Sequence, residues 1–128
     1  MYDSNNIFAK ILRGEVPCSK IYEDDYALAF NDIQPQAPVH ALVIPKGAYL
    51  SISDFSQNAA PGEIAGFFHA VGAVVKALGL ENDGFRTIAN TGLNGGQEVP
   101  HFHLHILGGR VLGPMLTKSP ASLGMTRK

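Results

Sequence analysis

The sequence has little cysteine, little charge and no long apolar run, and each shortage excludes a class of protein. The 128 residues include a single cysteine, Cys18, so an intramolecular disulfide is impossible and the cytoplasm is the expected compartment. Charged residues make up 16% of the chain and the formal net charge is −1. This balance argues against electrostatic capture of nucleic acid or of an anionic membrane surface. We therefore expect neither nucleic acid nor membrane as a partner.

Targeting and membrane signals are also missing. Residues 1–8 contain no basic segment followed by an apolar run, so no secretory signal is expected. The longest apolar stretch, 67–80, is interrupted by His69 and Lys76 and is too short to span a bilayer. A length of 128 residues with 45% apolar content predicts one domain, 1–128, with its own core at about 5–114. The tail, 115–128, lacks periodicity and fits either disorder or packing on a partner subunit.

Hydrophobic periodicity predicts an α+β domain. Apolar residues at helical spacing predict a long helix over 61–78, with Ile64, Phe67, Phe68, Val71, Val75 and Leu78 on its buried stripe. His69 falls off this stripe and is expected to face water. A short helix is predicted over 7–13, and strands over 19–23, 26–31, 39–44, 85–90 and 98–107, with a glycine-rich turn at 91–97. Consecutive strands with one inserted helix favour an antiparallel sheet covered on one face.

Three histidines alternate with apolar residues near the end of the chain. His101, His103 and His105 share one face of the predicted strand, because side chains switch faces at each residue. Phe102, Leu104 and Ile106 share the other face and anchor the strand in the core. The histidine face is therefore expected to line a cleft.

Three interpretations of this alternation are open. A strand face that only contacts water is disfavoured, because such a face rarely carries three histidines. A zinc site is disfavoured because the outer histidines lie about 13 Å apart along a strand, whereas each zinc-bound nitrogen lies within about 2.1 Å of the metal. Nucleophilic catalysis at phosphorus suits neutral imidazole, which titrates near pH 6.5. His103, with a histidine on each side, is then the natural nucleophile, and no metal or other cofactor is expected.

The same residues carry a family resemblance. The run 101–107, His-Phe-His-Leu-His-Ile-Leu, resembles the signature of the histidine triad (HIT) superfamily. The segments 7–17, 30–40, 42–46, 95–99 and 107–110 resemble its Hint branch, and Gly113-Pro114-Met115-Leu116 is similar to bacterial members. The resemblance covers roughly residues 7–114.

The resemblance implies a fold and an activity. The implied fold is a five-stranded antiparallel sheet with one long and one short N-terminal helix, and two copies join into a ten-stranded homodimer sheet. The implied activity is hydrolysis of purine nucleoside 5′-phosphoramidates, including aminoacyl-adenylate-type substrates, through a nucleotidyl-histidine intermediate. AMP or GMP is the expected product.

Site residues follow from the same resemblance. His103 matches the nucleophile, His105 the histidine that contacts phosphate and leaving group, His101 the one that orients the nucleophile, and His40 an upstream supporting histidine. Asp32 matches the acid that holds the ribose hydroxyls. Residues matching the apolar pocket around the base are Ile7, Phe8, Ile11, Phe30, Ile33 and Leu42. Residues matching the wall beside the phosphate are Asn90, Gly96 and Val99.

Two positions depart from the pattern. Glu98 stands where some relatives carry Ser, so its carboxylate is expected to point away from the phosphate or to contact the leaving amine. Pro100 removes a strand amide just before His101, which favours an edge or bulge there. Three other functions remain as alternatives: a dinucleoside polyphosphate hydrolase or nucleotidyl transferase, a non-catalytic nucleotide sensor, and a zinc hydrolase.

Overall fold

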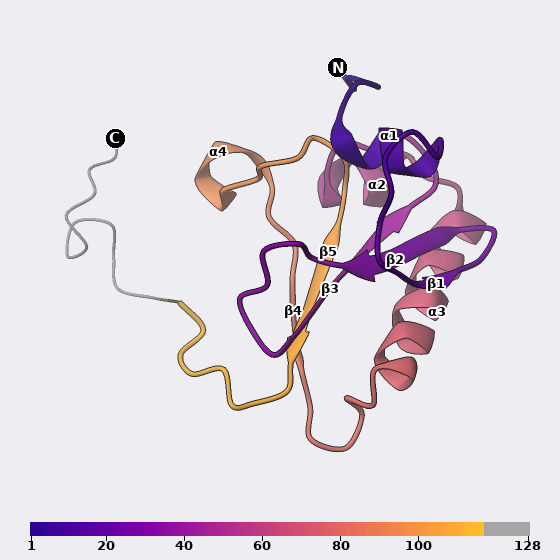
Figure 1. The fold of residues 1–128 in the computed structure, drawn as a ribbon. Helices are drawn as coiled ribbons and strands as arrows, with labels where there is room; N and C mark the ends of the chain where they lie inside the picture. The colour runs from indigo at the N-terminus through magenta and orange to yellow at the C-terminus, as the bar shows by residue number, and fades with distance from the viewer. Residues whose placement is uncertain (117–128) are drawn as a thin grey trace.

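A five-stranded antiparallel sheet forms the centre of the molecule (Figure 1). The computed structural model describes residues 1–116, so the tail prediction for 117–128 lies outside the described residues. The sheet order is β1-β2-β3-β5-β4, and every neighbouring pair is antiparallel. The strands are β1 (Lys20–Glu23), β2 (Ala27–Asn31), β3 (Val39–Pro45), β4 (Arg86–Ile88) and β5 (Leu104–Gly108). The helices are α1 (Ile7–Leu12), α2 (Ile52–Asn58), α3 (Pro61–Ala77) and α4 (Gly92–Gly95). The predicted α+β class is confirmed.

The sheet has one face for the core and one for a site. On β3, Ala41 and Val43 belong to the main core with residues of α2 and α3. The alternate residues Leu42 and Ile44 belong to a second cluster, which includes Phe8 of α1. Because strand side chains alternate, His40 shares the face of Leu42. α1 covers only part of this second face, so the rest is open for polar side chains.

The long helix α3 packs on the core face along a narrow stripe. Pro61 occupies its first turn, and the side chain of Glu63 accepts the amide of Ala60 at 3.2 Å. Phe67 is fully buried, whereas Phe68 is 49% exposed. The prediction that Phe68 belongs to the buried stripe is therefore wrong. Successive helical residues lie about 100° apart around the axis, and Phe68 falls at the margin of the contact. His69 is exposed, as predicted.

These adjacent phenylalanines form a matched test of the core. Phe67→Ala is expected to lower the free energy of unfolding by about 3–5 kcal/mol, because it leaves a cavity between Phe55 and Phe102. Phe68→Ala removes the same atoms from a half-exposed position and is expected to cost less than half as much. Urea denaturation of both variants measures the difference. Equal losses would show that the core does not centre on Phe67.

The last predicted strand is shorter than expected. The sequence predicted a strand over 98–107, but β5 begins at Leu104 and residues 98–103 are irregular. Pro100 cannot donate to a strand ladder, and the amide of Phe102 donates instead to the carbonyl of Tyr49 at 2.7 Å. Two short helices, α2 and α4, were not predicted. α4 replaces most of the expected 91–97 turn and is capped at its C-terminus by Gly96, whose φ of +73° suits glycine.

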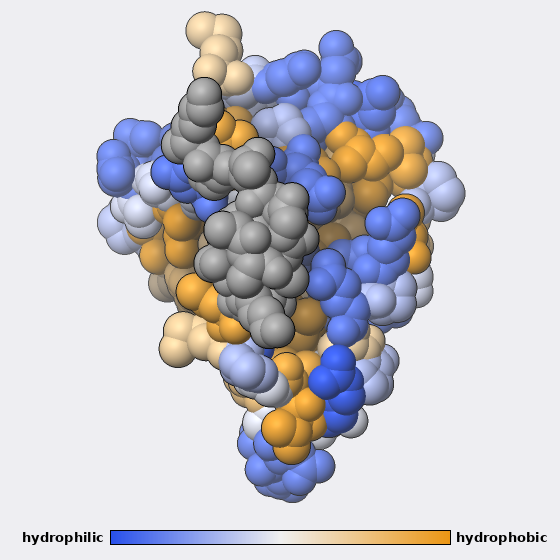
Figure 2. Space-filling view, turned by 90° about the vertical axis from the view of Figure 1, so that its left-hand side faces the viewer, coloured by the Kyte–Doolittle hydropathy of each residue, from blue (hydrophilic) through white to orange (hydrophobic). Residues whose placement is uncertain are grey.

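Apolar side chains on the surface are divided into patches. Figure 2 views the side that carries α4 and the segment after β5, where apolar patches alternate with polar ones. The exposed apolar residues of these segments are Leu93, Val111, Met115 and Leu116, at 81–90% of their full accessibility. In residues 1–116, no helix is both long and apolar enough to cross a membrane.

Candidate active site

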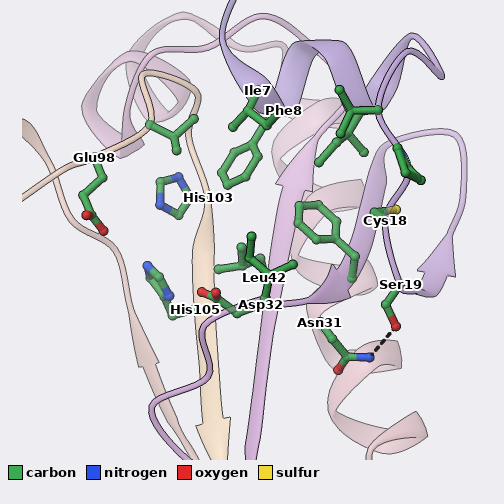
Figure 3. A pocket seen from close by; sticks show the side chains of 16 residues that line it. Ile7, Phe8, Cys18, Ser19, Asn31, Asp32, Leu42, Glu98, His103 and His105 are labelled. Atoms are coloured by element: carbon green, nitrogen blue, oxygen red, sulfur yellow. Dashed lines mark hydrogen bonds between the residues drawn. The ribbon is translucent and has the colours of Figure 1, made fainter.

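A pocket of about 290 Å³ opens beside α1 on the second face of the sheet. We call it the α1 pocket. Figure 3 shows apolar side chains on one side of it and His103, His105 and Asp32 on the other. The predicted residues that line it are Ile7, Phe8, Ile11, Phe30, Asp32, Ile33, Leu42, Val99, His103 and His105. Residues of its lining that were not predicted as ligand contacts are Val16, Pro17, Cys18, Ser19 and Asn31. Glu98, which was expected to point away from the phosphate or to contact the leaving amine, also lines it.

The ring of His103 has a fixed tautomer. Its Nδ1 lies 2.7 Å from the carbonyl oxygen of His101, and because a carbonyl only accepts, Nδ1 carries the proton. The lone pair of neutral His103 is therefore on Nε2. Phe8 packs against the ring in a T-shaped arrangement at a centroid distance of 5.0 Å. Burial lowers the pKa of His103 and keeps the ring neutral, which leaves Nε2 available as a nucleophile.

His101 is not among the residues that line the α1 pocket. The prediction that all three histidines face the cleft is wrong for this residue, which is completely buried. Its Nε2 donates to the carbonyl of Pro45 at 2.9 Å, so Nδ1 accepts the hydroxyl of Tyr2 at 2.6 Å. Burial lowers the pKa of His101. Since its own carbonyl orients His103, the residue acts on the site through the backbone.

His40 and His105 form a hydrogen-bonded relay that ends in the α1 pocket. The amide of Gln36 donates to Nδ1 of His40 at 3.0 Å, so Nε2 of His40 carries the proton. That Nε2 lies 2.8 Å from Nδ1 of His105 and donates to it. The proton of neutral His105 is therefore on Nε2. Burial, followed by the neighbouring His103 and His40, lowers the pKa of His105 to about 4. At pH 7 the residue is thus a neutral hydrogen-bond donor.

Asp32 has both a structural and a site contact. Its Oδ1 accepts the amide of Gln34 at 2.8 Å, which closes the turn after β2. Its Oδ2 lies 3.4 Å from Nε2 of His40 and on the wall of the α1 pocket. A carboxylate in this position accepts hydrogen bonds from vicinal hydroxyl groups of a bound ligand.

The donor set around Asp32 does not suit a metal ion. Ligand atoms of Asp32, His40 and His105 lie within 4.8 Å of one another. A metal takes the lone pair of an imidazole nitrogen, but Nε2 of His40 carries its proton. Coordination there would move the proton to Nδ1, against the amide of Gln36. The hydrogen-bond relay and a metal site therefore exclude each other.

The remaining predicted residues lie around a second hollow. We call this hollow the β4 pocket, because Ile88 of β4 forms part of it, and its volume is about 340 Å³. Asn90 and Gly96 line it, so the structure places them across His105 from the α1 pocket. The side chain of Asn90 donates to the carbonyl of Gly95 at 2.7 Å and thereby holds α4.

Sequence reasoning missed several residues that position the site. Gln97 donates to the carbonyls of Leu50 and Val99 at 2.7 and 3.0 Å and fixes the loop before His101. Gln36 and Tyr2 act on His40 and His101, as described above. Of these three residues, only Gln97 lies in a stretch that the sequence marked as unusual, the glycine-rich segment. The roles of Gln36 and Tyr2 come from contacts that form only in the folded chain.

His101, His103 and His105 predict a pH-dependent stability. Their folded pKa values lie below the value of about 6.5 for an unfolded histidine. Between pH 6.5 and about 4 the unfolded chain therefore binds more protons, and the free energy of unfolding falls as the pH drops. Denaturation at pH 7 and pH 5 measures the loss. His105→Asn removes one such group, and an unchanged loss in this variant would contradict the assignment.

Comparison with known proteins adds to this geometry. The HIT domain family model matches residues 13–112. A HIT-like protein of Azospirillum brasilense is 57% identical over 117 residues, which cover 91% of this chain and 96% of the relative. A protein of Escherichia coli K12 named purine nucleoside phosphoramidase is 47% identical over 111 residues, covering 86% and 92% of the two chains.

Solved structures agree with this comparison. A histidine triad protein from Clostridium difficile has a TM-score of 0.78 and 42% identity, covering 91% of this chain and all of its own. A HIT family hydrolase from Legionella pneumophila has a TM-score of 0.79 and 41% identity, covering 85% and 96% of the two chains. This chain is thus similar to these proteins over most of its length in both sequence and fold.

Proposed function

This chain belongs to the HIT family, and from that premise we propose that it is a hydrolase of purine nucleoside 5′-phosphoramidates. The relative from E. coli named purine nucleoside phosphoramidase supports this substrate class. The observation that carries the proposal is the tautomer of His103, whose Nε2 lone pair belongs to a neutral ring on the wall of the α1 pocket.

The proposed reaction has two displacements at the α-phosphorus. In the first, Nε2 of His103 donates its lone pair to phosphorus as the P–N bond breaks, and the leaving nitrogen keeps that electron pair and takes up a proton. In the second, water attacks phosphorus and loses a proton, and the bond to Nε2 breaks with return of its lone pair. The net reaction consumes one water and releases an amine and a nucleoside monophosphate.

The other histidines and the pocket have distinct roles in this proposal. His105 donates from Nε2 to a phosphate oxygen or to the leaving nitrogen, since His40 occupies its other nitrogen. The negative charge of a bound phosphate favours protonation of His105 and so helps to supply the proton. The apolar wall of the α1 pocket takes the purine, and Asp32 accepts the ribose hydroxyls.

Trapping the intermediate tests the proposal. Quench in alkaline denaturant within the first turnover of adenosine phosphoramidate, which spares the acid-labile P–N bond to imidazole, followed by peptide mass spectrometry at neutral to alkaline pH, is expected to find an adenylyl group on His103. A parallel series with dinucleoside polyphosphates and with nucleoside phosphoramidates should show faster turnover of the phosphoramidates. An adduct on another residue, or turnover without any adduct, would contradict the proposed role of His103.

We also propose that the protein works in the cytoplasm as a homodimer. The sheet order leaves β1 and β4 at the edges, and two such sheets can join edge to edge into one ten-stranded sheet. Sedimentation equilibrium is expected to give twice the chain mass, and a monomer at micromolar concentration would contradict this assembly.

A further inference from the structure

The α1 pocket and the β4 pocket meet at two side chains. His105 and Glu98 line both, while His103 lines only the α1 pocket. In the proposed reaction the purine occupies the apolar end of the α1 pocket and phosphorus lies next to His103. The attacking and leaving atoms in such a displacement lie roughly in line, so the leaving group points away from His103. The β4 pocket adjoins the α1 pocket at His105, the residue proposed to donate to the leaving nitrogen.

The lining of the β4 pocket combines polar side chains with the apolar Ile88 and Leu107, and it carries one acidic group. Gln36 and Asn90 contribute amides, and Glu98 is the sole carboxylate, with no Lys or Arg among the described residues that line it. In Figure 3, Glu98 lies on the far side of His103 and His105 from Cys18 and Ser19, which border the apolar end of the α1 pocket. The β4 pocket is therefore suited to an alkyl chain that ends in a polar or cationic group, and unsuited to an anion.

The charge of Glu98 has no partner within the protein segment described here. None of the ion pairs formed among residues 1–116 includes Glu98, which is exposed. A carboxylate beside a phosphate site repels the bound phosphate and so weakens substrate binding. A cation on the same substrate attracts the carboxylate and offsets this repulsion. The position of Glu98 at the junction of the two pockets places such a cation beyond the scissile bond, in the β4 pocket.

We propose that the β4 pocket binds the leaving group and that Glu98 favours amines carrying a second, cationic ammonium group. This inference rests on the proposed function and deepens it, because it names the class of leaving group: diamines and lysine-like alkyl amines rather than neutral alkyl amines. Glu98 is then a specificity-determining residue that contacts the departing portion of the substrate.

Two adenosine phosphoramidates that differ only in the end of the leaving amine test this inference. One carries a linear alkyl amine, and the other carries the same chain ending in an ammonium group. The wild-type protein is expected to show a kcat/KM about three- to tenfold higher for the cationic substrate at low salt, and the preference should shrink as salt screens the charge.

Charge variants of Glu98 complete the test. Glu98→Gln keeps the shape and should bring the two kcat/KM values close together, while Glu98→Lys should reverse the preference. Glu81→Gln removes a carboxylate on the exposed turn after α3 and should leave the ratio at its wild-type value. The measured quantity is the ratio of the kcat/KM values for the two substrates. A general loss of folding or of nucleotide binding lowers both values and leaves their ratio unchanged.

The contrary outcomes separate this inference from the proposed function. Equal turnover of both substrates by the wild-type protein, or a preference that survives in Glu98→Lys, would overturn the role of Glu98 and leave phosphoramidate hydrolysis standing. Hydrolysis of neither substrate would contradict the proposed function and this inference together.

Discussion

Replacing His103 with alanine is expected to lower kcat for adenosine phosphoramidate by about a thousandfold or more, because no other group replaces the attacking nitrogen. The Kd for AMP should change by only a few-fold, since the apolar wall and Asp32 remain in place. Stopped assays of amine release and titration calorimetry give the two values. His69→Ala, an exposed histidine on α3, is the control and should match the wild-type protein in both. Substantial turnover by the His103 variant would exclude it as the nucleophile.

Replacing His105 with alanine is expected to lower kcat by about 10²- to 10⁴-fold for substrates with an alkyl amine leaving group. The loss should be smaller for a leaving group of low pKa, such as a nitroaniline, because that nitrogen needs less help to depart. A loss of the same size for both leaving groups would assign His105 to phosphate binding alone. Activity equal to that of the wild-type protein would remove His105 from the reaction.

The relay predicts that His40 acts through His105. His40→Ala removes the donor that holds Nδ1 of His105 and so frees the ring to change its tautomer. In a double-mutant cycle the effects of the two substitutions on the activation free energy should therefore be non-additive, with a coupling energy of about 1–3 kcal/mol. His40→Gln, whose amide can still donate, should recover part of the rate. Full additivity would show that His40 supports the fold and not the orientation of His105.

Much of the fold was predictable because it follows from alternation and spacing in the chain itself. The period of two in 101–107 predicted that Phe102, Leu104 and Ile106 enter the core, and all three are buried there. The spacing in 61–78 predicted α3 to within one residue of its end. α2 was missed because its seven residues contain one buried side chain, Phe55, which is too few to show a helical period.

The site was predictable in its residues but not in its geometry. Every residue expected at the base or ribose lines the α1 pocket, because the resemblance carries these positions. The burial of His101 could not be predicted, since its ring is bonded to residues far away along the chain, among them Tyr2, 99 residues before it. The start of β5 at Leu104 depends in the same way on Tyr49, whose carbonyl takes the amide of Phe102.

Because the sheet has a core face and a site face, substitutions can change stability without changing the site. A deletion of one residue within a strand affects both. Substitutions at Ala41 or Ile106 tune the core without touching His40 or His105, which lie on the opposite surface of the same strands. Deleting a single residue within β5 would instead exchange the two surfaces. The imidazole of His105 would then face the core, and an aliphatic side chain would face the pocket. Folding and turnover would both be lost.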